Sequence, residues 1–201
     1  MGADERMFPS PWSKLPRIVA HNWKSCFDKN TLSDVAETLC TVAKIEDGDS
    51  LIGASLGGMV ACEIARIRKI KTLFLVGSAV HRDEISNVLR TFHPLAKIAP
   101  IEWLRLSAEK IPHELAQMFA DSNPAFVRAM CNAIFDWQGL NETTTKVYRI
   151  HGQHDLVIPL PKNTDLILKG GHLISISHAS ECVQFIQSRL TNEESTIDGH
   201  R

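Results

Sequence analysis

A serine on a glycine-flanked turn is the part of the sequence with the clearest capacity for chemistry. Residues 53–57 read Gly-Ala-Ser-Leu-Gly, with an apolar run before them and a helical pattern after them. In this strand-turn-helix context the sharp turn strains the serine backbone and projects its hydroxyl away from the sheet. We therefore predict that Ser55 is a nucleophile. Because the first N–H groups of a helix have no acceptor within it, the Leu56 N–H is the predicted first oxyanion donor.

A serine hydroxyl needs a base to take its proton, and the base needs a partner that orients it. Asp155 stands on a turn directly after one predicted strand, and His172 follows the next predicted strand in the same way. The carboxyl ends of parallel strands meet at one edge of a sheet, so both side chains are expected beside Ser55. The predicted catalytic residues are Ser55 as nucleophile, His172 as general base and Asp155 as orienting acid.

The remaining histidines and the cysteines show weaker patterns. His151 opens the loop before Asp155, and we expect it to make a structural hydrogen bond. Together with His154 it would supply only two ligands, so no metal is expected. The cysteines are widely spaced without a CxxC pair, which favours reduced thiols in a cytoplasmic protein; they are Cys26, Cys40, Cys62, Cys131 and Cys182.

Apolar runs and helical patterns alternate along the chain and must position these side chains. Such alternation predicts an α/β fold with a doubly wound, mostly parallel sheet. Strands are predicted at residues 17–20, 50–54, 72–76, 146–150 and 165–168, and helices at residues 32–43, 56–67 and 180–190.

One segment interrupts this alternation. Residues 81–142 consist of short helical pieces separated by prolines, and they predict a helical cap between two parts of the core, 1–80 with the serine turn and 143–190 with the acid and base. The polar tail, 191–201, is expected to be flexible. Aromatic side chains of the cap are expected to line an apolar substrate pocket, the alternative being that they form the cap's own core; the pocket candidates are Trp103, Phe119 and Phe126.

Length and charge restrict the possible classes of function. A chain of 201 residues fits one domain. Its formal net charge of -1, with no long run of charges of one sign, argues against nucleic acid as a partner, because phosphate binding needs a concentrated basic face. No apolar stretch approaches the roughly 18 residues of a membrane span, and the polar N-terminus is unlike a signal peptide. We expect a cytoplasmic protein that acts on a small molecule and not at a membrane.

Taken together, these pieces resemble the α/β-hydrolase superfamily over nearly the whole chain. The matching parts, in family order, are the serine turn, the glycine and serine at positions 77–78, the His-Gly-Gln-His-Asp segment at 151–155, and Gly171 with His172. The resemblance implies a cap that shapes the pocket for the acyl or alcohol group. It also implies that neither a metal nor an organic cofactor is required.

The chain departs from the family at two places. The helix that usually separates the strands bearing the acid and the base is reduced to a loop. Residues 2–8 resemble the loop that donates the second oxyanion N–H, so that donor falls on Met1; in a second register it falls on Trp23. The family's opening strands are expected to be missing or rearranged, including the strand between residues 17–20 and 50–54. The strand at 17–20 should then pair directly with 50–54, or another chain should fill the slot.

The leading hypothesis is a serine hydrolase that cleaves a small carboxylic ester or thioester through an acyl-enzyme on Ser55. Acyl transfer and carbon–carbon bond hydrolysis would use the same three side chains. An alternative of a different class is a catalytically impaired, truncated hydrolase fold that binds a ligand or a partner. Losing one oxyanion donor typically lowers turnover about 100- to 1,000-fold, so these three residue types alone do not distinguish the two classes.

Overall fold

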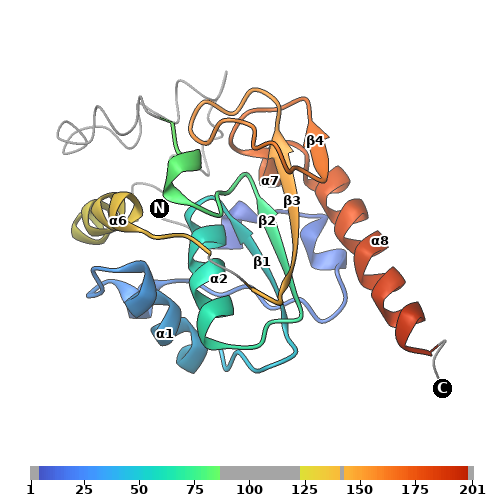
Figure 1. Ribbon diagram of the computed structural model, residues 1–201, viewed down its shortest axis with the longest axis horizontal. Helices are drawn as coiled ribbons and strands as arrows, with labels where there is room; N and C mark the ends of the chain where they lie inside the picture. Colours follow the sequence, from blue (N-terminus) through green and yellow to red (C-terminus); the bar gives the residue numbers. More distant parts are fainter. Residues whose placement is uncertain (1–4, 87–122, 141–142, 199–201) are drawn as a thin grey trace.

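The core of the protein is a four-stranded parallel sheet. The computed structural model describes residues 5–86, 123–140 and 143–198 (Figure 1). The strands follow one another across the sheet in chain order, β1-β2-β3-β4. In register, Ser50 lies opposite Thr72, Thr72 opposite Lys146, and Ile150 opposite Leu166. The bounds are β1 Ser50–Ala54, β2 Thr72–Val76, β3 Lys146–Gly152 and β4 Leu166–Leu168.

Helices cover both faces of this sheet, as Figure 1 shows. The alternation of side chains along β2 separates two cores: Leu73 and Leu75 pack with α1, α2 and α6, whereas Phe74 and Val76 pack with α7 and α8. This arrangement confirms the predicted doubly wound α/β class. The helix bounds are α1 Leu32–Val42, α2 Leu56–Ile67, α6 Pro124–Asp136, α7 Ile174–Ser177 and α8 Ala179–Asp198.

Local sequence signals account for where two of these helices begin. The Thr31 side chain caps α1 by accepting a hydrogen bond from the Asp34 N–H at 3.1 Å. Asn123 caps α6 in the same way, and Pro124 occupies the first turn, where a missing N–H costs nothing. Within the described part of the chain, no helix has the length and apolar character needed to cross a bilayer.

The predicted strand at 17–20 is wrong. Residues 18–23 have no regular structure, Arg17 has a positive φ of 53°, and the Val19 side chain is 71% exposed. Trp12 anchors this part of the chain instead: it is buried, and its Nε1 donates a hydrogen bond to the Ser175 carbonyl at 2.7 Å. The segment is therefore attached to the helices of one layer and not to the sheet.

Strand β1 is consequently an edge strand within the described residues. The predicted direct pairing of 17–20 with β1 is also wrong, because a groove of about 550 Å³ lies between them. Its lining includes Ile18 and His21 on one side and most of β1 on the other. Occupation of this slot by another chain stays a prediction.

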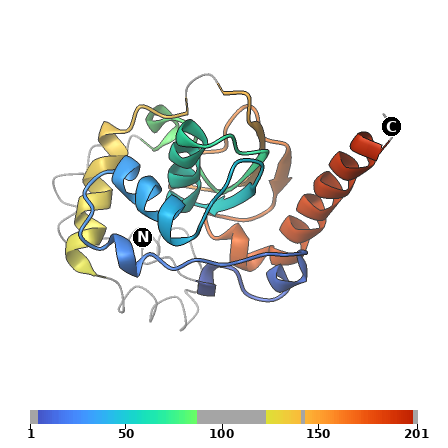
Figure 2. The same ribbon diagram turned by 90° about the horizontal axis from the view of Figure 1, so that it is seen from below.

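The C-terminal helix and the predicted cap also need comparison with the prediction. Helix α8 continues to Asp198, beyond the predicted end at residue 190, and extends away from the sheet (Figure 2), while the flexibility expected of the tail stays a prediction. Of the predicted cap, residues 81–86 and 123–140 are described, and they contain α6 and a short 3-10 turn, η4 (Arg82–Glu84). Trp103 and Phe119 lie outside the described residues, as does Met1.

Candidate active site

Ser55 lies between β1 and α2 in an unusual backbone conformation. Its φ of 51° and ψ of -124° lie outside the regions that L-residues ordinarily occupy. The turn is held by hydrogen bonds from the Ser55 N–H to the Val76 carbonyl, 3.1 Å, and from the Gly58 N–H to the Ser55 carbonyl, 3.0 Å. Backbone strain of this kind costs about 1–3 kcal/mol and persists only where surrounding contacts enforce it.

Close packing explains two of the glycines around this serine. A Cβ on Gly53 would lie 2.5 Å from the Gly57 carbonyl oxygen, and a Cβ on Gly58 would overlap the Ser78 hydroxyl. Strand and helix therefore approach more closely than side chains allow. Gly57 differs, because the nearest atom to its Cβ position is a Trp23 ring carbon at 3.8 Å.

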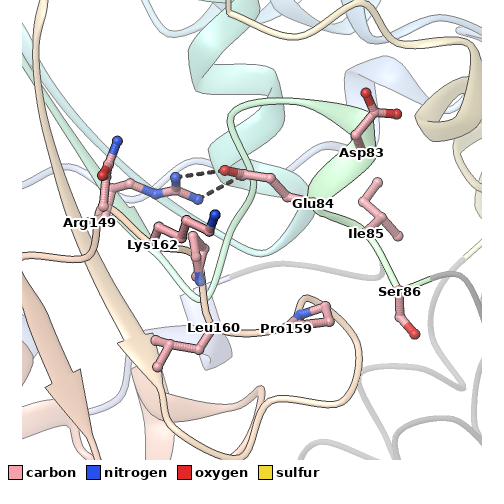
Figure 3. A pocket seen from close by; sticks show the side chains of 10 residues that line it. Asp83, Glu84, Ile85, Ser86, Arg149, Pro159, Leu160 and Lys162 are labelled. Carbon is pink, nitrogen blue, oxygen red and sulfur yellow. Dashed lines mark hydrogen bonds and ion pairs between the residues drawn. The ribbon is translucent and has the colours of Figure 1, made fainter.

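Ser78 supports the turn from the end of β2. Its hydroxyl donates a hydrogen bond of 2.7 Å to the Ser55 carbonyl. The Ser78 carbonyl in turn accepts a hydrogen bond from the Arg149 guanidinium at 3.3 Å. Arg149 also forms a bidentate ion pair with Glu84, at 2.7 and 2.8 Å (Figure 3). Ser78 belongs to a predicted family match, but a role in holding Ser55 was not predicted, since it depends on a contact between distant segments.

The structure brings the three predicted catalytic residues together. Ser55 Oγ lies 2.8 Å from His172 Nε2, and His172 Nδ1 lies 2.8 Å from Asp155 Oδ2. A carboxylate at Nδ1 requires a proton on that nitrogen, which leaves Nε2 free to accept the Ser55 proton. His172 and Asp155 are 7% and 5% exposed, so solvent competes little for these hydrogen bonds.

Four nitrogen atoms surround the Asp155 carboxylate, which lies in the loop after β3. Its Oδ1 accepts hydrogen bonds from the Val157 and Ile158 N–H groups, both at 2.9 Å. Its Oδ2 faces His172 and also His151, whose Nε2 is 3.2 Å away. Burial by itself raises the pKa of Asp155, but the hydrogen bonds from His151 and His172 outweigh it and hold that pKa well below its ordinary value. Asp155 is therefore an anion at neutral pH.

His151 makes the structural hydrogen bond expected of it, from Nε2 to the Ile158 carbonyl at 2.8 Å. Its approach to Asp155 was missed by the sequence analysis. The available signal was the spacing of four residues across the turn, which allows the two side chains to meet. His154, in contrast, is exposed, and the described residues contain no cluster of three or more potential metal ligands.

Comparisons with known proteins place this geometry in a wider context. No protein-family model and no curated protein sequence matches the chain. Among solved structures it is similar to a hydrolase, olei00960, from Oleispira antarctica, with a TM-score of 0.74 and 14% identity over 96% of this chain and 88% of that one. A putative lipase from Acinetobacter baumannii gives a TM-score of 0.64 and 18% identity over 84% and 70% of the two chains. A putative aryl esterase from Burkholderia cenocepacia gives 0.61 and 16% over 82% and 71%.

The protein has the α/β-hydrolase fold. At these identities the likeness establishes the fold, and the resemblance drawn from the sequence motifs is confirmed at that level. Within this α/β-hydrolase fold, Ser55 occupies the turn from strand to helix, while Asp155 and His172 follow β3 and β4. The connection between β3 and β4 contains no helix, as the short spacing of acid and base predicted.

The predicted oxyanion donors are described in part. Leu56 is the first residue of α2, where N–H groups lack intrahelical acceptors. Trp23 is half-buried, and its indole edge faces Gly57 close to the serine turn. The structure thus brings the Trp23 side chain beside the turn that carries Ser55, whereas Met1 is not described.

Of the aromatic residues predicted to line the pocket, Phe126 is described. Phe126 is 1% exposed and packs against Trp23 and Phe27, with ring centroids 6.3 and 5.5 Å away. This placement puts Phe126 in the main core, in contact with residues outside 81–142, and not in a core formed by the cap alone. Trp137 behaves in the same way, since it is buried and donates a hydrogen bond to Glu63 at 2.8 Å.

Two cavities are lined partly by residues of the sheet, one by β1 and the other by Arg149 of β3. The groove along β1 includes Ala54 and Gly57, which flank Ser55 in the sequence, and it also includes Trp23. The second cavity, of about 470 Å³, is bordered by the Glu84–Arg149 ion pair and residues 159–163 (Figure 3). Neither lining includes Ser55, Asp155 or His172, but only the groove includes near neighbours of Ser55, so the groove is the better candidate for admitting a substrate.

Proposed function

We propose that the protein is a serine hydrolase that cleaves a small carboxylic ester or thioester through an acyl-enzyme on Ser55. The observation that carries this proposal is the chain of two 2.8 Å contacts from Ser55 through His172 to Asp155, built on a strained turn. A base within this distance of a hydroxyl is positioned for proton transfer.

The first half of the reaction forms the acyl-enzyme. Ser55 Oγ attacks the carbonyl carbon while His172 Nε2 takes the hydroxyl proton. The Leu56 N–H donates to the oxyanion of the tetrahedral intermediate. This intermediate collapses as the bond to the alcohol or thiol breaks, and His172 returns the proton to the leaving oxygen or sulfur.

Water releases the acyl group in the second half. His172 takes a proton from water as the water oxygen attacks the acyl carbon, and the bond to Ser55 Oγ breaks with return of that proton to Ser55. The products are a carboxylic acid and the free enzyme. Asp155 remains an anion throughout and stabilises the imidazolium that forms at each step.

The names of the structural neighbours support hydrolysis, but these neighbours cleave several types of bond. They include a thermophilic esterase from Thermogutta terrifontis, a meta-cleavage product hydrolase from Pseudomonas fluorescens and an N-acyl homoserine lactonase. Ester-type substrates predominate among them, which favours an ester or thioester over carbon–carbon cleavage or acyl transfer. No metal or organic cofactor has a role in this proposal.

A second candidate is a binding protein of the same fold with little or no turnover. The edge of β1, which pairs with no other strand among the described residues, and the groove beside it favour this alternative. Both lie next to the serine turn, and the groove offers a partly apolar surface to a ligand or partner. In such a protein Ser55 would react slowly with acylating agents, even with His172 in place.

A covalent serine probe distinguishes the two candidates. A fluorophosphonate should add one adduct to the peptide that contains Ser55, and S55A should abolish it. S50A is the matched control, since Ser50 is exposed and begins β1, the strand that leads to Ser55. Hydrolysis of p-nitrophenyl acetate and an acetyl thioester should fall at least about 1,000-fold in S55A and H172Q. Labelling that persists in S55A would overturn the assignment, and slow labelling of Ser55 without ester turnover would favour the binding protein.

A further inference from the structure

One carboxylate oxygen of Asp155 is shared by two histidines. Oδ2 lies 2.8 Å from His172 Nδ1 and 3.2 Å from His151 Nε2. The other oxygen, Oδ1, already accepts two backbone N–H groups. Since a carboxylate has about four acceptor positions, Asp155 is saturated when His151 is included. His151 therefore completes the coordination of the residue that orients the proposed base.

The position of His151 determines which nitrogen carries its proton. The side chain is fully buried near the end of β3, and its Nε2 faces two acceptors, the Ile158 carbonyl and the Asp155 carboxylate. Nε2 must therefore be the protonated nitrogen. Nδ1 is buried with no hydrogen-bond partner among the described residues. A proton on Nδ1 would place an uncompensated donor in the core, so the neutral Nε2–H tautomer is favoured.

The other charged groups near Asp155 are either paired elsewhere or exposed. Arg149 lies on the same face of β3, two residues before His151, but its guanidinium is paired with Glu84. His154, on the same turn, is exposed. The ionisable groups that act on the Asp155 carboxylate are His151 and His172. Any change at His151 is thus transmitted to His172 through a single shared oxygen.

We infer that His151 is a positioning residue of the proposed hydrolase site: it holds the Asp155 carboxylate and limits how strongly Oδ2 binds His172. Two donors on one oxygen compete, so each hydrogen bond is weaker than it would be alone. When the His151 donor is removed, His172 is the only remaining side-chain donor to Oδ2. The hydrogen bond from His172 then becomes stronger, and the carboxylate is less restrained and can shift. The catalytic part of this inference rests on the proposed function, whereas its structural part does not.

The structural part is tested by NMR of the ligand-free protein. A proton shared between His and Asp gives a far-downfield imidazole resonance, assigned to His172 by its loss in H172Q. In H151F this resonance should move further downfield, while H151Q, whose amide restores an N–H donor, should return it toward the wild-type position. H154Q is the matched control on the same turn and should leave it unchanged. An unchanged or upfield resonance in H151F would overturn the inference.

A measurement on the wild type keeps the inference testable if H151F does not fold. Nitrogen-15 shifts should show His151 protonated at Nε2 and unprotonated at Nδ1 at neutral pH. A proton on Nδ1 would overturn the inference, because Nε2 would then be unable to donate to Asp155.

The catalytic part is tested by separating kcat from KM. With an ester substrate, H151F should lower kcat about 10- to 100-fold with little change in KM, since His151 positions the site without contacting substrate. H151Q should recover most of this loss, and H154Q should match the wild type. Equal losses in H151F and H151Q would overturn the positioning role. If the wild type neither labels at Ser55 nor turns over esters, the proposed function fails, and the NMR result still decides the structural inference.

Discussion

At the scale of single residues, the proposed chemistry depends on the buried carboxylate of Asp155. Its Oδ1 accepts two backbone N–H groups, and its Oδ2 lies 2.8 Å from Nδ1 of His172, the histidine beside Ser55, and 3.2 Å from Nε2 of His151. Burial opposes that charge, and hydrogen bonds from two imidazoles overcome the opposition. In the proposed hydrolase this carboxylate would link catalysis to stability, because the contacts that hold His172 also stabilise the folded state.

The lowered pKa of Asp155 predicts a pH-dependent contribution to stability. A carboxyl whose folded pKa lies below its unfolded value of about 3.9 stabilises the fold above that pH, and the contribution is lost as pH falls toward the folded pKa. Each unit of depression corresponds to about 1.4 kcal/mol. D155N should therefore be less stable than the wild type at pH 7, and the difference should shrink between about pH 4 and pH 2. Denaturant unfolding across this range measures it; a difference independent of pH would contradict the prediction.

At the scale of elements, the serine turn requires close approach of β1 to α2. Gly53 and Gly58 permit that approach, and Ser78 at the end of β2 donates to the strained Ser55 carbonyl. The next strands supply the acid and the base from their carboxyl ends. Because three parallel strands contribute to one edge, a displacement of any of them would separate Ser55 from His172.

The two glycines after the serine provide a matched test of this packing. G58A should be destabilised by about 1–3 kcal/mol and should lose most probe labelling, since its methyl group would overlap Ser78 and displace the turn. G57A should be tolerated and gain up to about 0.5–1 kcal/mol, because its methyl group meets nothing closer than 3.8 Å and alanine favours the helix. Thermal unfolding and labelling rates measure both; equal behaviour of the two variants would contradict the proposed packing.

The hydroxyl of Ser78 gives a second prediction for the same element. S78A removes the donor to the Ser55 carbonyl and should cost about 1 kcal/mol of stability. A loss of about 1 kcal/mol lowers the fraction of folded protein only slightly. Labelling at Ser55 should slow by more than this decrease explains, because the strained turn loses a contact that enforces it. S78T is not a suitable control, since added volume would press on Gly58. Unchanged labelling in S78A would show that backbone contacts alone hold the turn.

At the scale of the whole molecule, the N-terminal part is attached through Trp12 rather than through a strand. Trp12 is 1% exposed and bonded to Ser175, while Val19, in the segment predicted to be a strand, is 71% exposed. Residues 15–21 line one side of the groove that lies along the edge of β1. The second candidate function, binding of a ligand or partner, depends on that groove.

Two substitutions distinguish these modes of attachment. W12A should destabilise the protein by about 3–5 kcal/mol, because it removes a large core side chain and leaves the Ser175 carbonyl without its donor. V19S should change stability by no more than about 0.5 kcal/mol. Chemical denaturation measures both. A large loss in V19S would indicate that residues 17–20 pair with β1 in solution and would contradict the arrangement described here.

The sequence by itself determined the features that arise from neighbouring residues. Helix caps such as Thr31 depend on one turn of chain, and so does the strained turn at Ser55. The order of strands and helices then set the α/β class and the edge of the sheet at which Asp155 and His172 meet Ser55. These interactions span few residues or follow from strand direction, so a pattern of residue types was sufficient to predict them.

Only the tertiary structure decided the contacts between segments far apart in the chain. Residues 17–20 have the composition of a strand, but burial of Trp12 against α7 and α8 and a positive φ at Arg17 direct them away from β1. Phe126 entered the core for a related reason, since Trp23 and Phe27 cover it. His151 reached Asp155 because the turn after β3 folds back on the strand. The sequence of a short apolar run, or the type of a single residue, does not identify its tertiary contacts, because those contacts depend on packing across the molecule.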